Sequence, residues 1–351
     1  MPGLITHQRI FFESVTSLKK LKHPDHSTHL LDVQFSHPLF LSSALSGLLI
    51  PNLFDYLPGK RNIFFGNSIK HFLHSDDGAS VIFAMLNTLL NNANHEPNEW
   101  VYYQKGFFYG YISHWVADAI YHPFVFYWAG FPTYKDNRVP YYRNQHLLFE
   151  YTIDQYMAYF YNSEPFDYNL ERMVPHKNTI LYKATKDIFI NAIATIKPSI
   201  TFKPSIIAWL KHDGYDIALQ CVKPVYSLKK TRNAHLIKIL RFLEKRAYSD
   251  FLVRYPDARK INRHILNLHR DRWFNPSGEV GLHYESVDDL FRIVKEKTVT
   301  LWKQFEELLN LKEMVSPSQF NAVIEFANAY TGKKGFSLDG MIHQNPIRLR
   351  N

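Results

Sequence analysis

The run from Gly110 to Pro123 constrains the fold most, because its polar residues recur at helical spacing within an apolar and aromatic setting. His114, Asp118 and His122 follow one another at intervals of four residues, and residues four apart share one face of an α-helix. A helix that is apolar on nearly every side is buried among other elements. The run therefore predicts a buried helix that packs against other helices.

The same helical period recurs along the chain, whereas strand patterns are sparse. The predicted helices cover Ala79 to Leu90, Phe107 to Tyr121, His146 to Phe160, Ala234 to Ala247 and Val287 to Leu309. We therefore predict an all-α fold, with one multi-helix domain over residues 1–315. Residues 316–351 form a C-terminal extension that is partly irregular, and the tail from Thr331 to Asn351 is expected to be loosely ordered or peripheral.

Composition places the chain among globular proteins. Its 351 residues are 46% hydrophobic and 16% aromatic, which excludes a disordered chain. The single cysteine, Cys221, cannot form an internal disulfide, and no secretory-signal pattern is visible at the start, so we expect cytoplasmic residence. The most apolar stretch, Phe40 to Phe54, is interrupted by polar residues and is shorter than the roughly 20 residues that span a bilayer, so no transmembrane segment is expected.

The helical triplet predicts more than one metal ion. At about 1.5 Å of rise per residue, His114 and His122 stand roughly 12 Å apart along a helix, too far to share one ion. Asp118 lies between them, and a carboxylate can bridge two ions whereas a neutral imidazole gives one nitrogen to one metal. The alternative is a core helix whose buried polar residues pair with one another.

A second triplet, His146, Glu150 and Asp154, repeats this spacing on the next predicted helix. His146 and Glu150 are one turn apart and make a two-point clamp for an ion, with His122 as the third ligand. Asp154 is interpreted as a carboxylate that orients a ligand imidazole. Pro123 directly follows His122 and disfavours helical geometry there. The alternative for this triplet is a surface stripe, but the residues between its members are apolar.

Other candidate ligands are weaker, because each stands alone. They are His7, the stretch Pro51 to Asp55, and the stretch Lys70 to Gly78 with His71 and His74. The tract Lys22 to His29 has three histidines and an aspartate but no apolar frame, so it is interpreted as a solvated loop. His283 and His343 are interpreted as surface histidines.

Taken in chain order, these residues resemble the zinc-dependent phospholipase C family, whose helical members hold a trinuclear zinc site. The correspondence runs through His7, Pro51 to Asp55, His71, His114, Asp118, His122, His146 and Glu150. Trp273 to Glu279 and Glu285 to Phe291 resemble the closing segment of bacterial members. The resemblance extends to about residue 315 and implies a fold like that of phospholipase C and the zinc nucleases.

The resemblance also implies two or three bound zinc ions. It assigns Asp55, His71, His114 and Asp118 to the first ion, His122, His146 and Glu150 to the second, and His7 with Asp118 to the third. Many relatives carry Gly-Pro-Asp where this chain reads Ile-Pro-Asn at residues 50–52. The family's carboxylate is therefore either replaced by the Asn52 amide or supplied by Asp55, and we favour Asp55.

The function that the resemblance implies is zinc-dependent phosphoester hydrolysis, in which a metal-activated water attacks a phosphodiester and Asp55 accepts its proton. A net charge of +9 suits a phospholipid substrate and peripheral contact with a membrane, and it suits nucleic acid equally. One alternative is a different zinc phosphodiesterase, such as a nuclease-like enzyme. Another is a non-catalytic binding protein that zinc only stabilises.

Overall fold

The computed structural model describes most of the chain. The described residues are 3–20, 26–57, 65–93, 96, 98–133, 135–163, 165–196, 204–231, 233, 235, 253–278, 281–324, 328–336 and 338–349. Among them no strand forms, and the one β-type pairing is an isolated antiparallel bridge between Trp273 and His283. The all-α fold class predicted from the sequence is confirmed.

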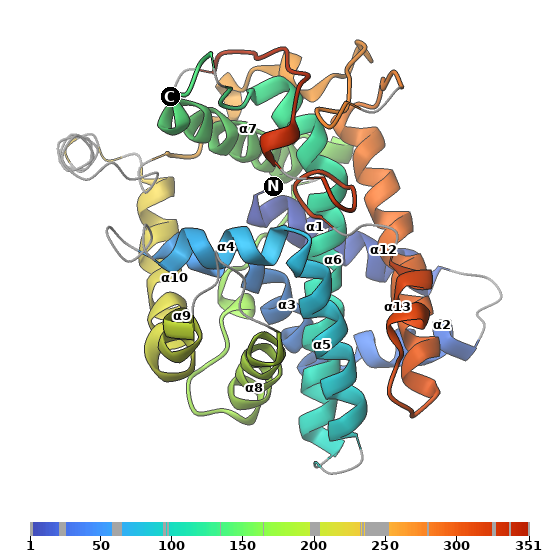
Figure 1. The fold of residues 1–351 in the computed structure, drawn as a ribbon. Helices are drawn as coiled ribbons and strands as arrows, with labels where there is room; N and C mark the ends of the chain where they lie inside the picture. The colour runs from blue at the N-terminus through green and yellow to red at the C-terminus, as the bar shows by residue number, and fades with distance from the viewer. Residues whose placement is uncertain are drawn as a thin grey trace.

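The helices form a bundle around one long central helix (Figure 1). In chain order they are α1 (Leu4–Lys19), α2 (His26–Ser36), α3 (Pro38–Leu53), α4 (Asn67–His74), α5 (Asp77–Asn92), α6 (Asn98–Ala129), α7 (Val139–Tyr159), α8 (Ile180–Thr195), α9 (Pro204–Trp209), α10 (Tyr215–Lys230), α12 (Val287–Asn310) and α13 (Pro317–Val323). The short 3-10 turn η1 (Phe54–Tyr56) extends α3. Helices α1, α3, α5, α7, α8 and α12 all contact α6.

The predicted helices agree with these bounds where the structure describes them. The segments beginning at Ala79, Phe107, His146 and Val287 lie within α5, α6, α7 and α12, except that Phe160 falls just beyond the end of α7. Apart from His235, the predicted helix Ala234 to Ala247 lies outside the described residues.

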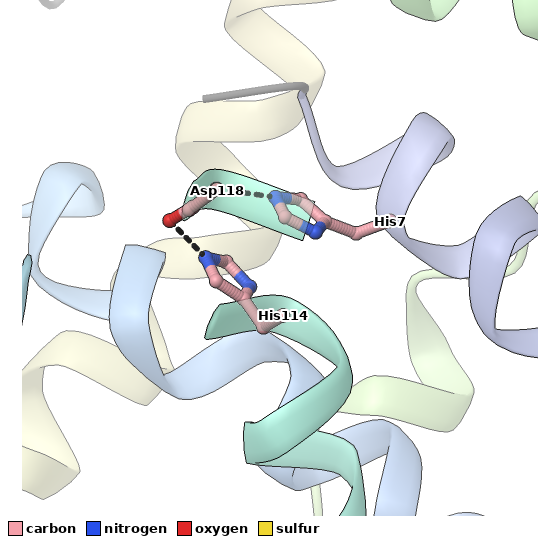
Figure 2. A group of neighbouring side chains, drawn as sticks. All are labelled: His7, His114 and Asp118. Atoms are coloured by element: carbon pink, nitrogen blue, oxygen red, sulfur yellow. Dashed lines mark ion pairs between the residues drawn. The ribbon is translucent and has the colours of Figure 1, made fainter. Parts of the chain in front are cut away.

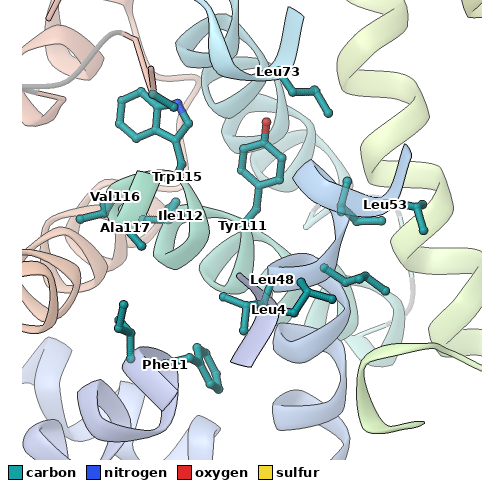
Figure 3. Packing of buried hydrophobic residues seen from close by; sticks show 14 of the residues in the cluster. Leu4, Phe11, Leu48, Leu53, Leu73, Tyr111, Ile112, Trp115, Val116 and Ala117 are labelled. Carbon is teal, nitrogen blue, oxygen red and sulfur yellow. The ribbon is translucent and has the colours of Figure 1, made fainter. Parts of the chain in front are cut away.

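Helix α6 is central because most of its residues are buried and most of the buried ones are apolar or aromatic. Its closest neighbour is α3, and glycines at the crossing allow the two backbones to touch. A Cβ added to Gly47 would lie 1.9 Å from the Phe107 carbonyl oxygen, and one added to Gly110 would lie 1.7 Å from that of Ala44. Figure 3 shows Trp115 of α6 in the same apolar core as residues of α1, α3 and α4. The polar face of α6 is therefore enclosed by neighbouring helices.

Among the described residues, one segment is long and apolar enough to cross a membrane, judged by length and composition alone. It consists of helix α3 and η1. This segment, Pro38–Tyr56, has a mean hydropathy of 1.2, and 78% of it is buried inside the fold. Burial of this extent is also found for the core helix of a globular protein.

The C-terminal tail, which we expect to be loosely ordered or peripheral, is irregular but forms hydrogen bonds to two helices. The amides of Asn345 and Ile347 donate to the carbonyls of Tyr127 and Trp128 at 2.8 and 2.7 Å. The Leu349 amide donates to the Gln145 side chain at 2.7 Å. The tail is thus held at the end of α6, where it satisfies carbonyls that the last turn leaves without a helical partner, and at the side of α7.

Candidate metal centre

The face of α6 predicted to bind metal is wholly buried. His114, Asp118 and His122 are each 0% exposed, and the His114 Nε2 lies 3.2 Å from the Asp118 Oδ2. Helix α6 continues unbroken through Pro123 to Ala129, so the disturbance expected at His122 is not seen. Neighbouring helices bury the segment around Pro123. This packing outweighs the tendency of proline to disfavour helical geometry at the residue before it, His122.

Helix α1 adds His7 to this face. The His7 Nε2 lies 3.2 Å from the Asp118 Oδ1, and the His7 ring stacks on that of His114 with centroids 3.8 Å apart (Figure 2). His7 is also 0% exposed. His7, His114 and Asp118 place ligand atoms within 4.8 Å of one another, so they can share a metal ion.

Helix α4 adds an imidazole that the sequence assignment lacks. His74 stands at the last position of α4 and is 1% exposed, and its Nε2 lies 2.9 Å from the Asp118 Oδ2. The imidazoles of His7, His74 and His114 therefore all approach one carboxylate. These four residues are called the inner set.

Within the described residues, the structure brings His74 rather than His71 to Asp118. His71 is exposed on α4, where its ring lies 5.9 Å from that of Tyr330. The two histidines flank the same apolar stripe of the helix, formed by Ile69, Phe72 and Leu73. Helical periodicity cannot choose between them, and the packing of α4 decides.

The tautomers of the buried histidines are fixed by backbone carbonyls. The Nδ1 of His74 lies 2.7 Å from the Lys70 carbonyl oxygen, and that of His114 lies 2.6 Å from the Leu48 carbonyl oxygen. The His122 Nδ1 donates to the Ala329 carbonyl. A carbonyl oxygen only accepts, so each Nδ1 carries a hydrogen, and each neutral ring has its lone pair on Nε2. Metal-binding histidines are commonly fixed in this way.

Electrostatics favour a cation in the inner set. Burial lowers the pKa of His7 to about 4 and also lowers that of His74, so both rings are neutral at pH 7. Although burial acts to raise it, the pKa of Asp118 lies well below its usual range because three histidines surround the carboxylate. Protonation of one imidazole would balance the negative charge of Asp118. The lone pairs on the Nε2 atoms of the remaining neutral rings would still point at the carboxylate oxygens. These Nε2 atoms and both Asp118 oxygens receive no hydrogen bond.

The spacing of these atoms fits a metal ion. Ligands about 2.0–2.2 Å from a tetrahedral zinc lie roughly 3.3–3.6 Å from one another, slightly farther apart than the contacts of a metal-free site. In the inner set, the Nε2 atoms lie 2.9–3.2 Å from the Asp118 oxygens. His7, His114 and Asp118 place their donors within reach of one ion, and His74 adds an imidazole beside the Asp118 Oδ2.

A second group, called the outer set, consists of His122, His146 and Glu150, as the sequence predicts. Its ligand atoms lie within 4.8 Å of one another, and the His146 Nε2 is 2.7 Å from the Glu150 Oε1. The His146 side chain is 14% exposed. The two sets adjoin, since the His74 ring lies 6.1 Å from the rings of both His114 and His122.

Among the described residues, the predicted ligand Asp55 belongs to neither set. It lies on η1, where its Oδ2 is 2.6 Å from the Lys70 Nζ, and both side chains are 17% exposed. Asn52 is buried, and its amide oxygen receives no hydrogen bond. The choice between Asn52 and Asp55 as the family's ligand therefore stays open.

Asp154 positions a helix rather than an imidazole. Its carboxylate accepts hydrogen bonds from the Ile5 amide at 3.2 Å and the Thr6 amide at 2.8 Å. The hydroxyls of Thr6 and Tyr255 also donate to it, at 2.7 and 2.9 Å. These bonds satisfy buried amides in the first turn of α1 that have no partner within the helix. Asp154 thus holds the turn of α1 that presents His7.

A C-terminal segment covers the centre, which sequence reasoning missed. The Ala329 amide donates to the His74 carbonyl at 2.8 Å, while its own carbonyl accepts from His122. The Tyr330 ring lies 5.3 Å from that of His74 and 5.2 Å from that of His122. The segment Asn328–Gly332 therefore joins ligands from two helices, and no local pattern in its sequence indicates this role.

The histidines interpreted as solvated lie outside both sets. His29 is exposed on α2, and residues 22–25 of its tract lie outside the described residues. His283 stacks on Trp273, and His343 lies near Phe274.

Comparison with known proteins identifies no relative. No protein-family model, no curated protein and no solved structure matches the chain. A functional assignment therefore rests on the residues of the centre.

Proposed function

We propose that the protein is a zinc-dependent phosphoester hydrolase that resembles the phospholipase C family and cleaves a phosphodiester. The observation that carries the proposal is the pair of adjoining sets, in which five imidazoles and two carboxylates from α1, α4, α6 and α7 converge. Imidazole with carboxylate suits zinc, whereas magnesium and calcium prefer oxygen ligands alone.

The two sets have the character of two different zinc sites. All three imidazoles and the carboxylate of the inner set are buried, and such complete enclosure is typical of a structural ion. The outer set supplies three donors and includes the partly exposed His146, which is typical of a catalytic ion with an open position. We therefore assign the reaction to the outer set.

The outer set is in the protonation state that binds metal at neutral pH. Burial lowers the pKa of His146 to about 4, so its ring is neutral. Although burial opposes this, the hydrogen bond with His146 and the positive charge of Lys70 help to lower the pKa of Glu150 to about 2. Bound zinc supplies Lewis-acid stabilisation of phosphoryl oxygens and lowers the pKa of water. Asp55 stays the predicted proton acceptor, because the bond to Lys70 engages only its Oδ2.

A structural role for both ions is the competing function, and the complete burial of the inner set favours it there. Metal analysis of the purified protein, followed by assays of the zinc-loaded form, separates the two. We expect two or three zinc ions per chain and turnover of bis(p-nitrophenyl) phosphate, with phospholipid and single-stranded DNA as further substrates. A folded preparation without metal contradicts the centre itself. Full zinc content with no turnover of any of the three substrates favours the structural role.

A further inference from the structure

Lys70 is attached at two points beside the centre. Its backbone carbonyl accepts from the His74 Nδ1 at 2.7 Å, and its Nζ lies 2.6 Å from the Asp55 Oδ2. The side chain lies on α4, one turn before His74, and is 17% exposed. An ammonium in this position is both fixed and reachable from solvent.

The charge of Lys70 acts on the outer set. Burial lowers the pKa of His146, and the positive charge of Lys70 lowers it further. The same charge helps to lower the pKa of Glu150. Lys70 and His74 share one face of α4, and the His74 ring lies 6.1 Å from that of His122, so Lys70 stands beside the outer set, while its bond to Asp55 holds it outside the ligands.

The Lys70 ammonium has N–H groups that the ion pair with Asp55 does not use. It carries three N–H groups, and the ion pair with Asp55 needs one of them. A phosphate ester that is ionised offers several acceptor oxygens, and a charge-assisted hydrogen bond from lysine to such an oxygen is strong. The lysine ammonium binds phosphate as a point charge. Unlike the planar guanidinium of arginine, it does not need two phosphate oxygens in a matching plane.

We propose that Lys70 binds an ionised oxygen of the substrate's phosphoryl group, so that the site selects phosphate esters with at least one negative charge. Asp55 is then also a positioning residue, because it holds the ammonium beside the outer set. The inference rests on the proposed function for the identity of the substrate. Binding of a phosphate anion, however, can be measured without any turnover.

The test is the binding of inorganic phosphate to the zinc-loaded full chain, measured by calorimetry. We expect Lys70→Met to weaken binding at least tenfold with unchanged zinc content, and Lys70→Arg to restore most of the affinity. Lys186→Met is the matched control, since Lys186 is 22% exposed and pairs with Asp216 at 3.1 Å outside both sets. It should bind phosphate like the wild type.

Two results overturn the inference. One is wild-type phosphate affinity in Lys70→Met with full zinc content. The other is loss of zinc from Lys70→Met and from Lys70→Gln, which shows that the side chain serves only to hold α4 in place. If Lys70→Met does not fold, Lys70→Gln gives the same comparison, because it keeps a donor to Asp55 but removes the charge.

Kinetics distinguish this inference from the proposed function. With a charged diester, Lys70→Met should raise KM more than it lowers kcat. If the wild type binds phosphate through Lys70 but cleaves no ester, the hydrolase proposal fails and the anion site remains. If Lys70→Met cleaves with an unchanged KM, the hydrolase proposal remains and the role of Lys70 fails.

Discussion

His74 places its Nε2 2.9 Å from the Asp118 Oδ2, whereas His71, on the same helix, is exposed. We expect His74→Ala to weaken zinc binding by the inner set, because it removes a buried imidazole that lies beside the Asp118 carboxylate. The loss of affinity should exceed the roughly 10- to 100-fold effect of changing a residue that only supports a ligand. His71→Ala is the control and should retain zinc, as measured by metal analysis. The opposite result returns the ligand role to His71.

In the metal-free protein, His7 makes the free energy of unfolding depend on pH. Burial lowers its pKa from 6.5 to about 4, so the unfolded chain binds the proton more tightly than the folded chain does. Its contribution to stability is therefore complete above pH 6.5 and is lost as the pH falls toward 4. At about 1.4 kcal/mol per pKa unit, the loss is about 3 kcal/mol.

Urea unfolding of the chelated protein between pH 7.5 and 4.5 measures this effect. The free energy of unfolding should fall with pH in the wild type and fall less in His7→Gln, which has no group that titrates there. Equal slopes for the two proteins contradict the assignment.

At the scale of elements, the segment Asn328–Gly332 is what joins α4 to α6 over the centre. Gly332 makes this possible, because its φ is +68° and a Cβ there would lie 2.7 Å from the Ala119 carbonyl oxygen. Any side chain at this position displaces the segment from α6. The Ala329 carbonyl would then be withdrawn from His122.

We expect Gly332→Ala to weaken zinc binding by the outer set about 10- to 100-fold, because it removes the partner that orients a ligand. Gly335→Ala is a matched control, since Gly335 has a φ of +70° but no atom within 4 Å of the added Cβ. Both variants carry the backbone strain of about 1–2 kcal/mol, and only Gly332→Ala adds the clash. Competition with a chromophoric chelator measures the affinity. Equal zinc affinity in the two variants contradicts the role of this segment.

At the scale of the whole molecule, the centre is part of the hydrophobic core, so metal binding and folding are coupled. We expect a chelator to remove zinc in two phases and to lower the melting temperature. The fast phase belongs to the outer set, where His146 is 14% exposed, and the slow phase to the inner set, whose donors are 0–1% exposed. His146→Ala should lack the fast phase and keep the slow one. A single fast phase from the wild type contradicts the distinction between the sets.

Local periodicity determined much of this arrangement. The four-residue spacing of His114, Asp118 and His122 placed them on one face of α6, and that of His146 and Glu150 made a clamp on α7. These assignments follow from the sequence because residues four apart on a helix are neighbours whatever surrounds the helix. The apolar residues around them likewise required a helical bundle. The zinc hydrolase function and the family resemblance remain predictions.

Tertiary structure alone decided which distant groups complete the centre. The choice of His74 over His71, the ion pair that draws Asp55 to Lys70, and the bond from His122 to Ala329 all join separate helices or loops. Each depends on how α4, η1 and the C-terminal segment pack against α6. A sequence pattern describes one face of one helix, whereas the meeting of two faces depends on the side chains of the whole core.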